Sequence, residues 1–327
     1  MKVLVTGATG FVGANVARSL EAFGHSVRAL VRPGSSTLNL KDTGFETVPG
    51  DIRDRESVVR GLRGCDAVVH CAAAYTFWAR DPGVIYDVNV SGTRVVLEEA
   101  LKAGVGRCVY TSTVSTVHIP KGGLGTEEVS ASPGELVGHY KRSKHQAEQE
   151  ALDLAGRGLP VVVVNPTTPV GPWDVKPTPT GRIVLDFIRG RVPAYVDTGM
   201  NVVDVEDVAA GHVLALEKGI PGERYLLGNR NMTLAQVFGV LEGLTGRRAP
   251  RLKLPTWMAI AAGYVDQVVE GMVLRREPAI PVEGLKVSRK PMYVDCRKAV
   301  ETLGVPQSPV EGALEKAVRW FREHGYD

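Results

Sequence analysis

Three glycines at a constant spacing of three residues stand near the start of the chain, at Gly7, Gly10 and Gly13. An apolar run at residues 2–6 precedes them and predicts a buried strand, and the sequence over residues 12–23 predicts a helix. No other feature restricts the fold as much as a strand that turns into a helix through three glycines. We expect these two elements to open a parallel α/β sheet.

The glycine segment also predicts a binding site. Gly7 permits a tight turn, Gly10 lets the backbone approach a pyrophosphate, and Gly13 lets the helix pack closely on the sheet. The helix N-terminus adds amide donors and a partial positive charge. A glycine-rich turn without a ligand is the alternative, and the strand before it and the helix after it count against that alternative. The residues expected at the dinucleotide are Gly7, Thr9, Gly10, Phe11, Val12 and Gly13.

Apolar runs and helical segments alternate along the first half of the chain. This alternation implies right-handed crossovers between parallel strands, with helices on both faces of the sheet. The predicted fold class is α/β, a doubly wound parallel sheet of the Rossmann type with a smaller, interleaved, mainly C-terminal domain. The strands are expected at residues 2–6, 26–31, 46–48, 67–70, 108–111 and 161–164.

The composition changes after residue 165, where prolines crowd a short interval. We expect this interval to be an ordered loop without regular structure. We place a dinucleotide-binding domain at residues 1–165, with a return near 202–228, and a mainly substrate-binding domain at 166–327. Within the return, residues 202–208 are expected to rejoin the sheet and residues 209–217 to form a helix. The prolines are Pro166, Pro169, Pro172, Pro177 and Pro179.

The composition excludes several classes of protein. A hydrophobic content of 44% supports a large core, and 39 basic residues against 36 acidic ones are too balanced for a nucleic-acid partner. Four cysteines without a C-x-x-C pair, and a first strand that leaves no room for a signal peptide, predict a cytoplasmic protein without structural disulfide or zinc. The apolar stretch at 257–265 is too short to span a bilayer, and we expect a buried or interfacial helix there.

The end of the second strand predicts which dinucleotide binds. An NAD enzyme usually has a carboxylate there, whereas this chain has Arg32 followed by Ser35 and Ser36. The guanidinium and hydroxyls suit a 2′-phosphate, so NADP(H) is favoured and NAD(H) stays possible. A solvated surface arginine is the alternative. Asp51 and Ile52, after the third strand, are placed to hold adenine, although a simple loop acid fits the spacing nearly as well.

Tyr140 and Lys144 form the candidate catalytic pair. Their spacing of four places both side chains on one helix face, so they can reach one cleft. A nearby ammonium favours phenolate, and we therefore expect Lys144 to lower the pKa of Tyr140 below its ordinary value of about 10. A chance pair without a catalytic role is the alternative. The occurrence of the pair after a nucleotide-binding pattern favours the catalytic interpretation.

Three hydroxyl residues stand at the carboxyl end of the strand predicted at 108–111. A hydroxyl at the carboxyl edge of the sheet can polarise a carbonyl, but spacing alone does not decide among Thr111, Ser112 and Thr113. Asn89 is expected near the start of a helix that faces the cleft, where its amide holds water or backbone or serves as an N-cap. No spacing of histidines or carboxylates suits a metal ion, so we predict no metal site.

Together these motifs closely resemble the extended short-chain dehydrogenase/reductase superfamily, the NAD-dependent epimerase/dehydratase type, over nearly the whole chain. Within it the sequence is most similar to the dihydroflavonol 4-reductase-like branch and, there, to hopanoid-associated sugar epimerases. The motifs that carry the superfamily resemblance lie at residues 6–13, 51–52, 89–93, 111–113 and 140–144. Those that carry the similarity to the branch are GHYKRSK at 138–144, NPTTPVGP at 165–172 and KPTPTGR at 176–182.

The resemblance implies roles for particular residues. It assigns the catalytic hydroxyl to Thr113, the acid/base to Tyr140, and to Lys144 a contact with the nicotinamide ribose as well as the phenol. It matches Arg32 to the residue that receives the 2′-phosphate and puts Pro166 beneath the nicotinamide. The other expected cofactor contacts are Ala72, Ala73, Thr111 and Thr168. Thr113 departs from the commoner serine, and its extra methyl should restrict the substrate pose.

The substrate stays open between two chemistries that use the same catalytic residues. A ketone or aldehyde reductase would consume NADPH, whereas a sugar epimerase would oxidise and reduce in turn without releasing its cofactor. Basic residues in or after the proline interval suit a nucleotide diphosphate, with solvated surface charges as the alternative. Aromatic residues suit a ring-bearing compound, with core packing as the alternative. The basic residues are Lys176, Arg182, Arg189 and Arg191, and the aromatic ones are Tyr75, Phe77, Trp78 and Trp173.

Three further hypotheses concern partners. By analogy with the superfamily, helices over residues 95–103 and 140–154 would form a homodimer contact. A non-catalytic nucleotide-binding protein is disfavoured because Thr113, Tyr140 and Lys144 are all present. Peripheral membrane association through residues 255–272 is compatible with a hydrophobic substrate, although packing on the smaller domain or on a partner subunit is the more ordinary use of such a segment.

Overall fold

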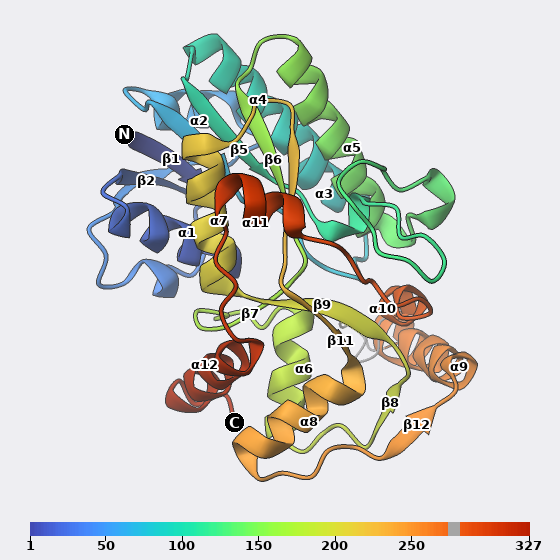
Figure 1. The fold of residues 1–327 in the computed structure, drawn as a ribbon. Helices are drawn as coiled ribbons and strands as arrows, with labels where there is room; N and C mark the ends of the chain where they lie inside the picture. The colour runs from blue at the N-terminus through green and yellow to red at the C-terminus, as the bar shows by residue number, and fades with distance from the viewer. Residues whose placement is uncertain (274–281) are drawn as a thin grey trace.

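A seven-stranded, wholly parallel sheet forms the centre of the computed structural model, which describes residues 1–273 and 282–327 (Figure 1). The chain order reverses between β1 and β4, so the carboxyl ends of these two neighbouring strands flank the switch point of a doubly wound fold. The predicted fold class is confirmed. Across the sheet the strands are β10 (Arg224–Leu227), β6 (Val161–Pro166), β5 (Arg107–Thr111), β4 (Ala67–His70), β1 (Lys2–Thr6), β2 (Ser26–Val31) and β3 (Glu46–Pro49).

Helices cover both faces of this sheet because successive strand residues point in opposite directions. Val3 and Val5 of β1 pack with α1, α7 and α11, whereas Leu4 packs with α2, α4 and α5. All three side chains are fully buried, and burial of each stabilises the fold by about 1.5–3 kcal/mol. The helices are α1 (Phe11–Ala22), α7 (Val205–Lys218) and α11 (Arg297–Leu303) on one face, and α2 (Arg55–Leu62), α4 (Gly92–Ala103) and α5 (Gly138–Gly156) on the other.

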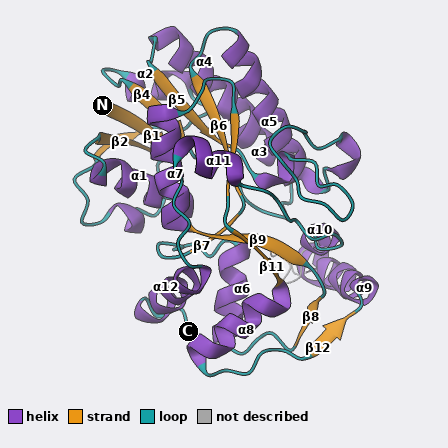
Figure 2. Ribbon diagram, in the orientation of Figure 1, coloured by secondary structure: helices purple, strands orange, loops and turns teal. Residues whose placement is uncertain are grey.

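A smaller unit lies beyond the carboxyl edge of the large sheet (Figure 2). It joins a three-stranded sheet, β11 (Arg230–Thr233), β9 (Gly199–Asp204) and β7 (Thr168–Val170), to a pair, β12 (Leu252–Leu254) and β8 (Ala194–Val196). Its core contains Phe187, Phe238, Trp320 and Phe321. Its helices are α6 (Pro179–Ile188), α8 (Leu234–Thr245), α9 (Thr256–Asp266), α10 (Val282–Val287) and α12 (Val310–Glu323).

Short helical segments complete the described chain. Two of them, α3 and η2, lead into α4, and η2 brings Asn89 against Ala74 in the loop after β4. These segments are η1 (Leu38–Leu40), α3 (Gly83–Tyr86), η2 (Asp87–Ser91), η3 (Val114–Thr116), η4 (Pro133–Glu135) and η5 (Gln267–Val273). Within the described residues no helix combines the length and the apolar character needed to cross a bilayer.

Two expectations about the second half of the chain are wrong. Residues 202–208 do not rejoin the large sheet, because β9 pairs with β7 and β11, and β10 takes the place beside β6 instead. The proline interval also holds regular structure, since β6 ends on Pro166, β7 follows, and α6 begins on Pro179. Proline is tolerated at a strand end and in the first turn of a helix, where its missing N–H leaves no hydrogen bond unmade.

Candidate active site

The glycine segment makes β1, β4 and α1 approach each other closely. Gly7 has φ +79°, which favours glycine, and a Cβ there would lie 2.6 Å from the amide nitrogen of Ala72 after β4. The Gly10 amide donates to the Gly7 carbonyl at 2.9 Å. A Cβ on Gly13 would overlap that same carbonyl, so the helix passes directly against the turn. Side chains at these positions would push the three elements apart.

The start of α1 suits an anionic ligand. Gly10 is the N-cap and offers no side-chain oxygen, and no acidic residue occupies the first turn. The amides of this turn are therefore left for an outside acceptor, and the dipole favours negative charge. Asn39 of η1 donates to the carbonyls of Thr9 and Trp173 at 3.1 Å each, which fixes the loop beside this helix end. These residues fit the pyrophosphate of a dinucleotide.

The region at the ends of β2 and β3 is charged and open. Arg32 is exposed, and its carbonyl accepts the Ser35 amide at 3.0 Å, so the two predicted 2′-phosphate residues share one turn. Asp51 pairs with Arg53 at 2.8 Å, and hydrogen bonds from Arg53 hold the pKa of the Asp51 carboxyl below its ordinary value. Ile52 is buried and would meet a Cβ on Gly92 at 2.6 Å.

Tyr140 and Lys144 lie one turn apart on α5 and are both buried. The Tyr140 ring lies 4.8 Å from the ring of Tyr75 and 6.3 Å from that of Phe77, and the Thr113 side chain lies near enough to the Tyr140 hydroxyl to lower its pKa. The structure thus brings the predicted tyrosine and the predicted threonine together beneath two aromatic side chains. The aromatic residues come from the loop after β4.

The Lys144 amine is held by a neighbouring strand. It donates to the hydroxyl of Tyr110 and to the carbonyl of Thr111, each at 2.7 Å, and lies 4.4 Å from the centre of the Tyr110 ring. Two of its three N–H donors are therefore used within the protein. Burial lowers the pKa of Lys144 to about 7.

The expected effect of Lys144 on the phenol is wrong for this structure. Burial raises the pKa of Tyr140 above its ordinary value, with the nearby Tyr75 adding to the rise and the Thr113 hydrogen bond opposing it. The lysine amine faces Tyr110 and Thr111 instead of stabilising a phenolate. Desolvation of the charged form outweighs the cation four residues away. Tyr140 is therefore a protonated phenol at neutral pH.

The structure separates the three hydroxyls at the carboxyl end of β5. Thr111 Oγ1 lies 2.9 Å from Nε2 of His212 on α7 and 3.2 Å from Cys71 Sγ, so it points away from Tyr140. Ser112 Oγ is buried and has no hydrogen-bond partner in the described structure. Thr113, the N-cap of η3, accepts the Ser115 amide and contacts the Tyr140 hydroxyl. Only the third hydroxyl shares a site with the tyrosine.

Asn89 connects the loop after β4 to the catalytic helix. Its side-chain oxygen accepts the Ala74 amide at 2.7 Å, and its nitrogen donates to the Ala74 carbonyl at 3.2 Å and to Ser143 Oγ at 2.9 Å. It lies inside η2 and is fully buried, so the N-cap alternative is wrong. Asn89 fixes the backbone beside Tyr75 relative to Tyr140.

The sequence did not predict a buried hydrogen-bond network that joins the glycine segment to α4 through His70. His70 Nδ1 lies 2.6 Å from Thr6 Oγ1, its Nε2 lies 2.9 Å from Thr93 Oγ1, and its ring stacks on Tyr110. Burial lowers the pKa of His70 to about 3, so it stays neutral. A polar residue that ends an apolar strand beside the glycine segment is the signal that would have pointed to it.

The proline interval reaches back over the cofactor region. The Pro172 carbonyl accepts from Asn15 of α1 at 3.1 Å, and the Trp173 ring lies 3.7 Å from the Arg18 guanidinium. Trp173 therefore packs against α1 and is not part of the aromatic group at Tyr140. Pro166 is buried at the end of β6, and Thr168 opens β7. The predicted basic residues Arg189 and Arg191 follow the C-terminal end of α6.

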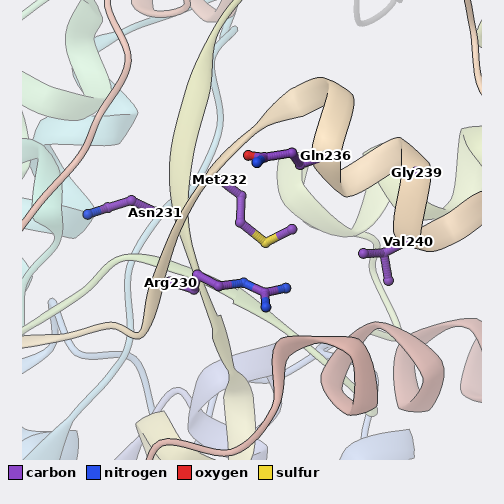
Figure 3. A pocket seen from close by; sticks show the side chains of 6 residues that line it. All are labelled: Arg230, Asn231, Met232, Gln236, Gly239 and Val240. Carbon is purple, nitrogen blue, oxygen red and sulfur yellow. The ribbon is translucent and has the colours of Figure 1, made fainter.

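A hollow of about 440 Å³ in the smaller unit lies away from these groups (Figure 3). Its lining comes from β11 and α8, and none of it belongs to the predicted site. Arg230 in this lining forms an ion pair with Glu311 at 2.6 Å, and Asn231 points away from the other five. The hollow holds no acid, base or nucleophile aimed at a common point. The lining residues are Arg230, Asn231, Met232, Gln236, Gly239 and Val240.

Residues 3–228 match the model of the NAD dependent epimerase/dehydratase family. A protein of Synechocystis sp. with the provisional name dihydroflavonol 4-reductase is 46% identical, over 98% of this chain and 95% of its own length. Sterol demethylase protein B of Methylococcus capsulatus is 38% identical over 99% of each chain.

A solved structure has the same fold. It is that of a nucleoside-diphosphate-sugar epimerase from Pseudomonas aeruginosa, 28% identical, with a TM-score of 0.83 over 100% of this chain and 99% of that one. The match to the family model covers the glycine segment, the strands of the large sheet and the helix with Tyr140 and Lys144. The chain belongs to the NAD dependent epimerase/dehydratase family and is an NAD(P)-dependent oxidoreductase of the extended short-chain dehydrogenase/reductase type.

Proposed function

We propose that this chain is an NADP(H)-dependent reductase that acts on a hydrophobic, ring-bearing ketone or aldehyde. One observation carries the proposal: the protonated Tyr140 hydroxyl lies near Thr113, and the Tyr140 ring contacts the rings of Tyr75 and Phe77. A carbonyl compound with an apolar ring would pack on these rings and direct its oxygen to the two hydroxyls. The 46% identical relative with a reductase name supports the same choice.

The bound nicotinamide supplies the hydride for the carbonyl carbon. Tyr140 Oη donates its proton to the carbonyl oxygen as charge develops there, and Thr113 Oγ1 holds the same oxygen by a hydrogen bond. The products are an alcohol and a tyrosinate, which regains its proton from solvent. The raised pKa of Tyr140 makes the phenol fully protonated before each turnover and the tyrosinate quick to recover a proton.

Lys144 has two roles in this mechanism. Its bonds to Tyr110 and Thr111 fix the amine at the carboxyl edge of β5, and its third N–H is left for the ribose of the nicotinamide. Residues of the glycine segment, with Ala72, Ala73, Pro166 and Thr168, would surround the cofactor from the carboxyl ends of β1, β4 and β6. Loss of the Lys144 amine should therefore weaken cofactor binding and slow the reaction together.

The preference for NADP(H) over NAD(H) rests on Arg32. This exposed guanidinium and the Ser35 turn stand at the end of β2, where the chain has no carboxylate for the ribose hydroxyls. A 2′-phosphate would pair with the guanidinium and accept from the serine. Binding of NADPH at least ten times tighter than NADH would support this assignment, and equal affinities would contradict it.

A sugar epimerase is the second candidate, because the family description and the 28% identical structure both name epimerases. Such an enzyme would use Tyr140 first as base and then as acid. The aromatic groups near Tyr140, and the position of Arg189 and Arg191 beyond the far end of α6, favour the reductase. Retention of a tightly bound cofactor through turnover would favour the epimerase.

We also propose a homodimer built on α4 and α5 and a cytoplasmic location. The two helices pack side by side and present ion pairs such as Arg94 with Glu150, which a second copy would cover. The four cysteines are unpaired, as expected in a reducing compartment. Sedimentation velocity at micromolar concentration tests the first proposal: a 70 kDa species, about twice 35.1 kDa, supports it and a monomer contradicts it.

The function itself is tested by nicotinamide absorbance. Purified protein is incubated with NADPH or NADH and a panel of ketones, aldehydes and nucleotide sugars, with Tyr140→Phe as control. Net NADPH consumption with an apolar ring ketone, abolished in the variant, supports the reductase. Conversion of a sugar epimer without net consumption would replace it with the epimerase.

A further inference from the structure

The outward face of α9 is apolar, which is unusual for a surface helix. On this outward face Trp257 is 70% exposed and Val265 is 65% exposed, whereas Ile260, on the inward face, is buried. The exposed residues fall at helical spacings of one, four, five, seven and eight from the first, so they share one face. This outer face continues into η5 through Val268 and Val269. We name it the α9 face: Trp257, Met258, Ala261, Ala262, Tyr264, Val265, Val268 and Val269.

A comparison with α12 shows how different this face is. The exposed positions of α12 are charged: Glu311, Glu315, Arg319, Arg322 and Glu323. The exposed positions of α9 carry no charge at all. Contiguous exposed apolar side chains of this size mark an interaction surface and not an ordinary solvated helix. The described residues of the chain leave the α9 face uncovered.

Basic residues flank the α9 face in the sequence and lie on or after the helix packed against it. Arg251 and Lys253 directly precede α9, and Arg289 and Lys290 follow α10, which packs along it (Figure 1). Arg251, Arg289 and Lys290 are exposed and form no ion pair with a described residue. Lys253 pairs with Asp197 at 3.1 Å, so the basic residues near this helix that are left for an outside anion are Arg251, Arg289 and Lys290.

We infer that the α9 face binds the surface of an anionic lipid bilayer. A helix that presents tryptophan, tyrosine and valine to the outside, with lysine and arginine beside it, matches the chemistry of an interfacial segment. The rings and aliphatic groups would enter the acyl boundary, and the basic residues would attract anionic headgroups. A second protein copy would not need the surrounding positive charge, so the charge favours lipid over self-association.

The α9 face adjoins the proposed substrate site. α10 packs on α9, with the Lys286 amine 5.2 Å from the Tyr264 ring. On its other side α10 reaches the active site, because Gly284 lies beside Phe77 and the Glu283 carboxylate lies against Gly138, two residues before Tyr140. A membrane-dissolved ketone would therefore leave the bilayer next to the aromatic groups at Tyr140. This last step, but not membrane binding, rests on the proposed reductase function.

Vesicle co-sedimentation of the full-length protein tests the inference. Vesicles of phosphatidylcholine with 30% phosphatidylglycerol are compared with phosphatidylcholine alone. We expect binding to the anionic vesicles, reduced about tenfold or more in Trp257→Glu. Arg289→Gln and Lys290→Gln should each weaken it about fivefold. Ile220→Glu is the matched control, because Ile220 is 60% exposed but lies beside the large sheet, and its binding should equal that of the wild type.

Tryptophan fluorescence gives an independent readout. Anionic vesicles should shift the emission of the wild-type protein to shorter wavelength, and the shift should disappear in Trp257→Phe. Absence of wild-type binding, or equal binding by Trp257→Glu and Ile220→Glu, would overturn the inference. A concentration-dependent dimer that Trp257→Glu abolishes, without vesicle binding, would assign the face to a second copy and overturn it too. Turnover of a water-soluble ketone without vesicles, measured in parallel, shows whether the reductase proposal stands or fails separately.

Discussion

The cofactor half and the substrate half of this site are built from different materials. At the cofactor half the backbone forms the site: glycines at Gly7, Gly10 and Gly13 bring two strands and a helix together, and unpaired amides face outward. At the substrate half the site consists of side chains from distant segments, with Tyr75 meeting Tyr140 and Thr113. Backbone geometry tolerates few residue types, whereas side-chain geometry depends on packing elsewhere. The two halves should therefore respond differently to substitution.

The largest effect is expected at the substrate half. Tyr140→Phe removes the proton donor but keeps the ring between Tyr75 and Phe77, so kcat should fall about 1,000-fold. The affinity for NADPH, measured by fluorescence titration, should change less than threefold. A variant that loses cofactor affinity as severely as activity would show that the two halves are not separate.

The glycine segment gives the next largest effect. Gly13→Ala places a Cβ on the Gly7 carbonyl and should cost about 1–3 kcal/mol of stability and at least tenfold in NADPH affinity. Gly239→Ala is the control, because a Cβ there meets nothing within 4 Å on helix α8 and should stabilise by about 0.5–1 kcal/mol. Calorimetry and titration measure both quantities. Equal behaviour of the two variants would remove the argument for a close backbone approach.

Asn89 tests the connection between the halves. Asn89→Ala leaves the amide and carbonyl of Ala74 and the hydroxyl of Ser143 without their partner. Because the loop beside Tyr75 is then free to shift, we expect kcat to fall about tenfold, roughly 1.4 kcal/mol, with KM for NADPH nearly constant. Asn89→Asp keeps the acceptor for Ala74 and should recover part of kcat. A uniform loss of folded protein with unchanged kcat per folded molecule would indicate a purely structural role.

Arg32 tests the cofactor half of the site separately from the substrate half. Arg32→Ala should raise KM for NADPH about fivefold to tenfold, because a charge-assisted contact is worth about 1–1.5 kcal/mol at an exposed site. KM for NADH should stay the same, since it has no 2′-phosphate. An equal rise for both cofactors would mean that Arg32 acts through the adenine or the fold.

The smallest expected effect concerns pH and the buried Lys144. Its pKa in the folded protein is lowered to about 7, whereas the unfolded chain holds the proton up to about 10.4. Between these values the unfolded state binds more protons, so this residue makes stability rise with pH. Lys144→Met should therefore exceed the wild-type Tm at pH 6.5 by a few degrees, and the difference should shrink toward pH 9.5. A difference that grows with pH would contradict the lowered pKa.

The sequence was most informative where the structure depends on local pattern. β1, β2, β4, β5 and β6 are buried runs in a parallel sheet, and their bounds were predicted to within two residues. β10 was missed because it begins with Arg224, whose guanidinium is buried beside Glu148, an arrangement that only the tertiary structure supplies. Residues 202–208 have the same apolar pattern as a sheet strand, yet β9 belongs to the smaller sheet.

The site shows the same division. The glycine segment and the Tyr140–Lys144 spacing could be predicted because they are local. The residue pattern alone did not decide between Thr113 and Thr111. That choice depends on the positions of His212 on α7 and Tyr140 on α5. The raised pKa of Tyr140 could not be predicted either, because it depends on how far Tyr75 and its neighbours exclude water. The role of Asn89 depended on its contact with Ser143, 54 residues away.

Isotope transfer tests net hydride transfer to a carbonyl at Tyr140. NADPH carrying deuterium at the transferable position of C4 is incubated with the protein and an apolar ring ketone, and the product is analysed by mass spectrometry and NMR. We expect one deuterium on the new carbinol carbon, with equimolar NADP⁺, and about 1,000-fold less product in the same time with Tyr140→Phe. Unlabelled products with every carbonyl tested, together with epimerisation of a sugar by an enzyme whose cofactor stays bound, would contradict it.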